Sequence, residues 1–215
     1  MNVQTAEPSA HQTCSQTEPV PTSTATPPAH IRRLVLTGFM GAGKTTVGRL
    51  LADRIGWDFL DLDAYIESRT GMSVPSIFAE HGERHFRQLE SQALASALGR
   101  HDIVLALGGG APESLTNRLL IEQTPDTATI FLDAPFPTLF DRCMMQALNP
   151  GQLANPAQAR PVLADPAVAE ARFLTRQPIY RRLARLTLST DNLTADETVD
   201  ALLTGLSRFP APPRR

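Results

Sequence analysis

Short apolar runs alternate along this chain with longer segments that have the hydrophobic spacing of helices. The apolar runs are RLVLTG (33–38), WDFLDLD (57–63), DIVLALGGG (102–110), TATIFLD (127–133) and RLTLST (185–190). Nearly continuous apolar character is typical of strands that are buried on both faces. The alternation therefore predicts an α/β fold in three layers, with a five-stranded parallel sheet flanked by helices.

Helix signals fill the segments between the apolar runs. Glycines mark the expected ends of two helices, and Thr194 is a candidate N-cap for the last helix. The predicted helices span residues 44–55, 82–98, 135–147, 167–184 and 195–206. Residues 148–165 are rich in Pro, Ala, Asn and Gln and have no apolar periodicity, so we expect a long loop that serves as a lid.

The two ends of the chain differ in composition from the rest. Residues 1–30 are rich in Thr, Ser, Gln and Pro, and residues 210–215 contain almost no apolar side chain. Segments of this kind bury too little surface to offset the entropy lost on ordering. We therefore expect disordered tails at 1–30 and 210–215, on either side of one folded domain at 31–209.

Charge and cysteine content limit the possible classes of partner. The formal net charge of -2 gives no general attraction to nucleic acid or anionic lipid. No apolar run approaches the ~20 residues that cross a bilayer, and residues 1–30 contain no Lys or Arg, unlike a signal peptide. Cys14 and Cys143 do not form a disulfide framework. We expect a cytoplasmic protein, a monomer, with no nucleic-acid or membrane partner.

A glycine-rich turn follows the first predicted strand. Gly38, Gly43, Lys44 and Thr45 fit the pattern G-x-x-x-x-G-K-[ST], which lies here between a strand and a helix, as phosphate binding requires. Backbone N–H groups would surround the phosphates, Lys44 would reach the β- and γ-phosphates, and the Thr45 hydroxyl would bind Mg²⁺. A chance glycine turn is the alternative. The motif in this context predicts a nucleoside triphosphate site of the P-loop type.

Two acidic residues end the second predicted strand. Asp61 and Asp63 are two positions apart, which would place them on the same side of an extended backbone. One carboxylate could orient water on Mg²⁺ while the other accepts a hydroxyl proton, as phosphoryl transfer to an alcohol requires. The alternative is a solvated strand exit in which Asp63 caps the next helix.

Two further motifs could contact the acceptor substrate. Arg87 and Glu90 are three residues apart on one helix face, as either an ordinary ion pair or an arginine held to bind a carboxylate. Gly108, Gly109 and Gly110 follow the third strand, where they either allow a simple turn or let a ligand approach the backbone.

Three residues of the C-terminal half are ambiguous on their own. Arg160 lies in the expected lid, and Arg176 and Tyr180 lie in the helix that follows it. Arginine is mostly a surface residue, so each is by itself more typical of an exposed position.

Taken in order, these motifs resemble the shikimate kinase family. The segments that carry the resemblance are GFMGAGKTTVGRLLA, FLDLDAYIE, GMSVPSIFAEHGERHFRQLE, VLALGGGA, ARPVL and RQPIYRRLA, and together they cover residues 31–206. The resemblance implies an adenylate-kinase-like P-loop fold. It also implies transfer of a phosphoryl group from ATP, with Mg²⁺, to the 3-hydroxyl of shikimate, on the route to chorismate and the aromatic amino acids.

The resemblance also implies roles for individual residues. Asp63 would hold the shikimate hydroxyls and act as base, and Glu90 would hold the arginines on the carboxylate. Positions implied for shikimate are Asp63, Arg87, Glu90, Gly109, Gly110 and Arg176. Positions implied for ATP and Mg²⁺ are Gly38, Gly41, Ala42, Gly43, Lys44, Thr45, Thr46, Asp61 and the lid residue Arg160. The segment CMMQALNPGQLANPAQA departs from the family in length and lacks Lys and Arg, so no adenine-packing arginine is assigned.

Two other readings remain open from the residues. A kinase of the same architecture for another small molecule, such as a gluconate kinase, would be favoured if Arg87 and Arg176 did not face a carboxylate. A nucleotide-dependent binding module without turnover would not need both Asp61 and Asp63.

Overall fold

The computed structural model describes residues 26–148 and 165–210 of the 215-residue chain. Most of the expected N-terminal tail, nearly all of the expected lid and most of the expected C-terminal tail lie outside these residues. Arg160 and Cys14 lie outside them as well. No helix within the two described ranges is long and apolar enough to cross a membrane.

The predicted five-stranded parallel sheet is confirmed. The strands are β1 (Arg33–Thr37), β2 (Asp58–Asp61), β3 (Ile103–Ala106), β4 (Thr127–Asp133) and β5 (Leu186–Ser189), and they pair in the order β2-β3-β1-β4-β5. The expectation that every strand is buried on both faces is correct for β1 and β3 and nearly so for β4. It is wrong for β2 and β5, which are the edge strands and are partly exposed.

The helices agree in part with the sequence pattern. They are α1 (Lys44–Ile55), α2 (Leu62–Thr70), α3 (Val74–Leu98), α4 (Leu115–Gln123), α5 (Phe136–Leu148), α7 (Pro166–Leu183) and α8 (Ala195–Leu206), with a 3-10 turn, η1, at Ala111–Glu113. Helices α1 and α8 have the predicted bounds, and α5 and α7 are displaced from them by one residue at each end. The pattern did not predict α2, α4 or η1.

Helix α3 begins earlier than the predicted start at Gly82. Ser73 caps its N-terminus by accepting a hydrogen bond from the Ser76 amide, and Pro75 lies in the first turn. Gly82 has non-helical backbone angles, φ 78° and ψ 170°, so the helix breaks there and then continues. The predicted start at Gly82 therefore coincides with a kink inside a longer helix.

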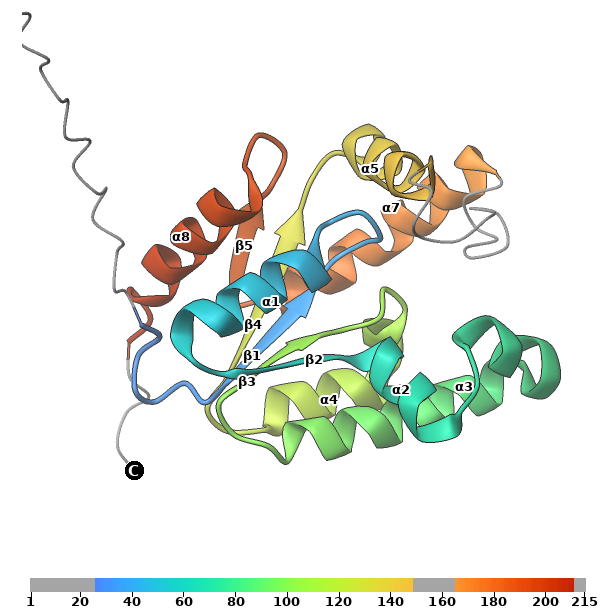
Figure 1. Cartoon of the computed structure of the whole chain (residues 1–215), viewed down its shortest axis with the longest axis horizontal. Coiled ribbons are helices and arrows are strands. Elements are labelled where there is room, and N and C mark those ends of the chain that lie inside the picture. The colour runs from blue at the N-terminus through green and yellow to red at the C-terminus, as the bar shows by residue number, and fades with distance from the viewer. Residues whose placement is uncertain (1–25, 149–164, 211–215) are drawn as a thin grey trace, which may run out of the picture.

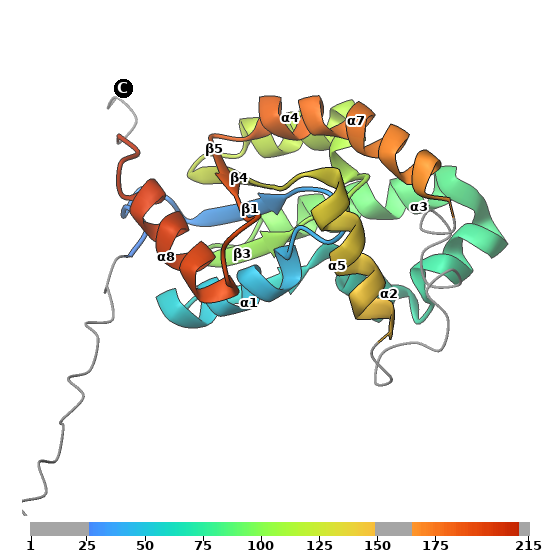
Figure 2. The ribbon, with the colours of Figure 1, turned by 90° about the horizontal axis from the view of Figure 1, so that it is seen from above.

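The core has two parts because successive side chains of a strand point to opposite faces of the sheet. In β1, Leu34 and Leu36 belong to one buried cluster and Val35 to the other. Figure 2 shows α1 and α8 below the sheet and α4 and α7 above it. This arrangement confirms the predicted three layers.

The carboxyl ends of the three strands that carry the candidate motifs meet at one edge of the sheet. Ala106 at the end of β3 pairs with Leu36 of β1 on one side and with Asp61 of β2 on the other. The loops that leave these ends therefore start side by side (Figure 1). In open parallel α/β sheets this edge is where ligands bind.

Helix α8, which covers one face of the sheet, starts with a capping box. The Thr194 hydroxyl accepts a hydrogen bond from the Glu197 amide at 3.2 Å, and the Glu197 carboxylate accepts one from the Thr194 amide at 2.8 Å. The backbone and side chain of Thr194 lower the pKa of the Glu197 carboxyl below its usual value. The ionised carboxylate is therefore the form that supports the cap.

We predict that Thr194→Ala lowers the free energy of unfolding by about 1 kcal/mol, because an N-cap hydroxyl contributes on that scale. The difference from the parent should shrink at acidic pH, because protonation of Glu197 weakens the box in the parent. Urea denaturation at neutral and acidic pH measures both effects. Thr204→Ala is the control, since that exposed hydroxyl donates to the Asp200 carbonyl of its own helix; an equal loss there would contradict the capping role.

Candidate active site

The turn between β1 and α1 has the backbone shape of a phosphate-binding loop. Gly41 has φ 77°, and a Cβ there would collide with the Leu139 carbonyl oxygen of α5. Gly43 occupies the N-cap of α1 with φ 86° and gives no side-chain hydrogen bond to the helix. The partial positive charge of this helix end therefore faces the loop. The Lys44 ammonium donates to the carbonyls of Gly38 and Phe39, at 2.9 Å each.

A hydroxyl and a carboxylate lie together beside this loop. Thr45 Oγ1 donates to Asp61 Oδ2 at 2.7 Å. The other carboxylate oxygen of Asp61 accepts from the amides of Asp63 and Ala64, at 3.1 and 3.3 Å, and so caps α2. Asp61, and not Asp63, is the capping residue.

The expectation that Asp61 and Asp63 share one side of an extended strand is wrong. Strand β2 ends at Asp61, and Asp63 lies in the first turn of α2. The helix turns the Asp63 side chain toward the next loop, where a Cβ on Gly108 would lie 2.6 Å from Asp63 Oδ1. The two carboxylates therefore lie in different parts of the site, Asp61 beside Thr45 and Asp63 against the triple glycine.

The oxygen atoms of Thr45 and Asp61 fit a Mg²⁺ ion that is bound mainly through phosphate and water. Mg²⁺ prefers hard oxygen ligands and commonly keeps several waters, with only one or two protein groups. Within the described ranges, no three His, Cys, Asp or Glu side chains group together as a metal site. The arrangement suits an ion that arrives with a nucleotide.

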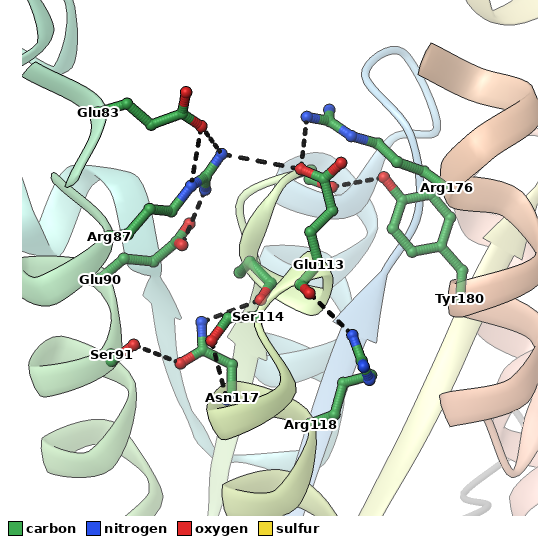
Figure 3. A network of polar contacts seen from close by, with 12 residues as sticks. Glu83, Arg87, Glu90, Ser91, Glu113, Ser114, Asn117, Arg118, Arg176 and Tyr180 are labelled. Carbon is green, nitrogen blue, oxygen red and sulfur yellow. Dashed lines mark hydrogen bonds and ion pairs between the residues drawn. The ribbon is translucent and has the colours of Figure 1, made fainter. Parts of the chain in front are cut away.

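Arg87 is held on α3 by two carboxylates. Its guanidinium donates to Glu90 at 2.9 Å and to Glu83 at 3.2 and 3.4 Å (Figure 3). Glu90 is 1% exposed and Arg87 is 26% exposed. An ordinary surface ion pair would leave both groups in solvent, so the burial of Glu90 favours a positioned arginine.

Burial shapes the charges of this pair. Burial raises the pKa of the Glu90 carboxyl above its usual value. Arg87 acts to lower this pKa, and the nearby Asp63 and Glu113 carboxylates act to raise it further. Burial acts to lower the pKa of Arg87, but Glu90 and Glu83 outweigh it and leave that pKa above its usual value. Arg87 therefore stays positively charged, and several carboxylates interact electrostatically with that charge.

The triple glycine brings the backbone against the side chains of the site. A Cβ on Gly110 would lie 2.6 Å from Arg87 Nη2. A Cβ on Gly109 would lie 3.6 Å from Arg176 Nη1 and 3.9 Å from the Gly38 carbonyl oxygen of the phosphate loop. The glycines therefore allow Asp63, Arg87, Arg176 and the phosphate loop to converge on one stretch of backbone.

Arg176 and Tyr180 are buried, so their interpretation as ordinary surface residues is wrong. Arg176 is 8% exposed and Tyr180 is fully buried, both on the side of α7 that faces the sheet edge. The Tyr180 hydroxyl donates to the Gly109 carbonyl at 2.5 Å. Burial raises the pKa of Tyr180, so the phenol stays protonated as a donor.

Glu113 joins the two arginines and was not singled out in the sequence. Its Oε2 atom accepts from Arg176 Nη2 at 2.9 Å and lies 3.8 Å from Arg87 Nη2 (Figure 3). Its position three residues after the triple glycine was the only available signal, and its contacts come from helices far away in the sequence. The structure thus brings together Asp63, Arg87, Glu90, Arg176 and the glycines, while Arg160 lies outside the described residues.

Comparison with known proteins adds an independent result. Residues 40–207 match the family model described as shikimate kinase. A shikimate kinase of Thermobifida fusca is 43% identical over 172 residues, which cover 78% of this chain and 91% of the relative. One of Thermus thermophilus is 38% identical over 183 residues, 81% of this chain and 90% of the relative.

Solved structures show the same relationship. A shikimate kinase from Acinetobacter baumannii in complex with shikimate superposes with a TM-score of 0.70 and 33% identity, covering 82% of this chain and 93% of that one. A gluconokinase from Sinorhizobium meliloti has a TM-score of 0.55 and 19% identity, covering 83% and 93%. The second likeness shows the fold alone.

We predict that Tyr180→Phe lowers the free energy of unfolding by about 1–3 kcal/mol, because it leaves the Gly109 carbonyl without its donor. Tyr65→Phe is the matched control, since it removes the only other tyrosine hydroxyl of the chain. The Tyr65 hydroxyl bonds Ser96 and Arg69 at the surface, where water can replace it. Urea denaturation of both variants measures the difference. Equal losses would contradict a structural role for the Tyr180 bond.

Proposed function

This chain belongs to the shikimate kinase family, and we propose that it transfers the terminal phosphoryl group of ATP to the 3-hydroxyl of shikimate. The product, shikimate 3-phosphate, lies on the route to chorismate and the aromatic amino acids. We further propose a monomer that acts in the cytoplasm on these two small molecules.

One observation carries this proposal. Gly109 lies between the phosphate loop and the arginines, since a Cβ there would be 3.9 Å from the Gly38 carbonyl and 3.6 Å from Arg176. A nucleotide held by the loop and an acid held by the arginines would therefore meet over the triple glycine. Such proximity is the main requirement for phosphoryl transfer, in which the protein supplies position and charge.

The two arginines suit a substrate carboxylate. Arg87 and Arg176 approach the same point from α3 and α7, and the buried Glu90 holds Arg87 in place. Guanidinium groups bind carboxylates through pairs of charge-assisted hydrogen bonds. The backbone of Gly109 and Gly110 would lie along the shikimate ring in this arrangement.

Asp63 suits the role of the group that holds the reacting hydroxyl. Its carboxylate lies against Gly108, at the same sheet edge as the phosphate loop. The hydroxyl oxygen would attack the terminal phosphorus of ATP, and the bond from that phosphorus to the oxygen of ADP would break. The hydroxyl proton would pass to Asp63 and then to solvent, with no phosphoenzyme formed.

The phosphate loop suits the rest of the reaction. The amides of the loop from Gly41 through Thr46, including Ala42, would surround the phosphates, and Lys44 would neutralise the charge that develops on them. Members of this family use ATP with a divalent metal, and we propose that Mg²⁺ is the ion, held by Thr45 and by water oriented on Asp61. When bound, Mg²⁺ would neutralise phosphate charge. Arg160 would approach from the lid.

We predict that the protein releases ADP from ATP when shikimate is added and not when gluconate is added. Asp63→Asn should lower kcat/KM for shikimate at least ~100-fold, because positioned acid–base groups contribute on that scale. A coupled assay for ADP measures both. Asp58→Asn is the control, since Asp58 is exposed at the start of β2, the strand that precedes the helix of Asp63. ADP release with gluconate alone would overturn the proposed substrate, and an Asp63→Asn variant as fast as the parent would overturn the role of Asp63.

We also predict that Arg87→Lys raises KM for shikimate about tenfold or more and leaves KM for ATP nearly unchanged. Lysine keeps the charge but loses the planar fork, and each ~1.4 kcal/mol of lost binding is a factor of ten. Steady-state kinetics with both substrates varied measures the two constants. Arg84→Lys is the control because Arg84 is exposed one turn earlier on α3. An unchanged shikimate KM in Arg87→Lys would remove the carboxylate-binding role.

A further inference from the structure

Glu113 lies where the proposed function places a substrate carboxylate. Its Oε2 atom is 2.9 Å from Arg176 Nη2 and 3.8 Å from Arg87 Nη2, so one carboxylate oxygen contacts both guanidinium groups. Figure 3 shows the Glu113 side chain reaching up between them from the loop below. Glu83 and Glu90 differ from Glu113 in this respect, because each of them forms its ion pair with Arg87.

The backbone beneath Glu113 is firmly anchored. Asn117, which is fully buried, donates to the Ala111 carbonyl at 2.9 Å and accepts from the Ser91 hydroxyl of α3 at 2.7 Å. Arg118 donates to the carbonyls of Pro112 and Glu113, at 2.6 and 2.9 Å. These bonds fix the turn η1 at the base of the site, so Glu113 can change place mainly by rotating its own side chain.

The contact between Glu113 and Arg176 is incomplete. It uses the Nη2 atom, while the buried Nε atom of Arg176 finds no hydrogen-bond partner among the described residues. A buried donor without a partner is unfavourable. Glu113 is also 38% exposed, so water can take over its carboxylate when the contact breaks. The ion pair between Glu113 and Arg176 is therefore suited to replacement by another carboxylate.

We propose that Glu113 is an internal competitor for the substrate carboxylate. In the free protein its carboxylate pairs with the two guanidinium groups, and an incoming carboxylate must displace it to form the same bonds. Glu113 then turns toward solvent while the anchored backbone stays in place. The inference rests on the proposed function, because it assumes that Arg87 and Arg176 bind the carboxylate of shikimate.

A competitor and a supporting residue differ in how their removal changes substrate binding. If Glu113 mainly held the arginines in position, its removal would weaken substrate binding. As a competitor that also repels an anionic ligand, its removal should strengthen binding. We expect a three- to tenfold effect, about the range between an exposed ion pair and a charge-assisted hydrogen bond.

The test is Glu113→Gln, which keeps the size of the side chain and removes its charge. Calorimetric titration of the full-length protein should show a dissociation constant for shikimate that is about three- to tenfold lower than in the parent. The dissociation constant for ATP should stay the same. Thermal unfolding of the variant verifies that the fold is kept.

Glu83→Gln is the matched control. It removes one negative charge that also pairs with Arg87, at 3.2 Å, but Glu83 is not bonded to Arg176. If Glu113 acts through direct competition, Glu113→Gln should strengthen shikimate binding clearly more than Glu83→Gln does. Equal gains from both variants would reduce the effect to general repulsion and overturn the proposal.

Two further outcomes distinguish a failure of the competitor role of Glu113 from a failure of the proposed function. An unchanged or raised dissociation constant in Glu113→Gln, in a protein whose parent form phosphorylates shikimate, overturns the competitor role alone. A parent protein that neither binds nor phosphorylates shikimate overturns the proposed function and this inference together.

Discussion

Two positive charges are held a short distance apart at the carboxyl edge of the sheet, and the rest of the site is arranged around them. Arg87 comes from α3 and Arg176 from α7, and both approach the single carboxylate of Glu113. Like charges in a partly buried place repel each other unless anions lie between them. Glu113 lies between them, and Glu90 and Glu83 further offset the charge of Arg87. This balance holds both guanidinium groups at one place, where a ligand carboxylate would have to displace that of Glu113.

The sheet and its glycines make this convergence possible. Because the ends of β1, β2 and β3 are level, the phosphate loop, the α2 turn and the triple glycine leave the sheet side by side. A side chain on Gly110 would occupy the place of the Arg87 guanidinium, and one on Gly108 the place of the Asp63 carboxylate. The backbone is thus bare where three charged groups meet. Parallel strand ends supply the location, and the absence of side chains supplies the space.

Much of the fold could be predicted from the sequence because the signals are local. The hydrophobic runs of the strands, the P-loop motif and the helix caps at Gly56 and Thr194 each depend on residues close together in the sequence, and the structure agrees with them. Edge exposure of β2 and β5 could not be predicted, since it depends on the order of strands in space. Helix α2 was missed because only Leu62 and Ile66 of its residues are buried, which leaves no clear apolar face.

The site was predictable in its residue types and less so in its geometry. Asp63 was singled out as a possible acid–base group on an extended backbone, whereas the structure places it on a helix, against the triple glycine. Glu113 could not be found, because its two partners lie 26 and 63 positions away along the chain, and only tertiary packing brings them together.

The function of this site depends most on whether the two arginines bind a carboxylate. Calorimetric titration of the protein with shikimate and with its neutral carboxamide tests this claim, because the two ligands share the ring and the hydroxyls and differ in charge. We predict that the carboxamide binds at least ~10-fold more weakly, since charge-assisted hydrogen bonds to both guanidinium groups are lost. Equal affinity for the two ligands would contradict it.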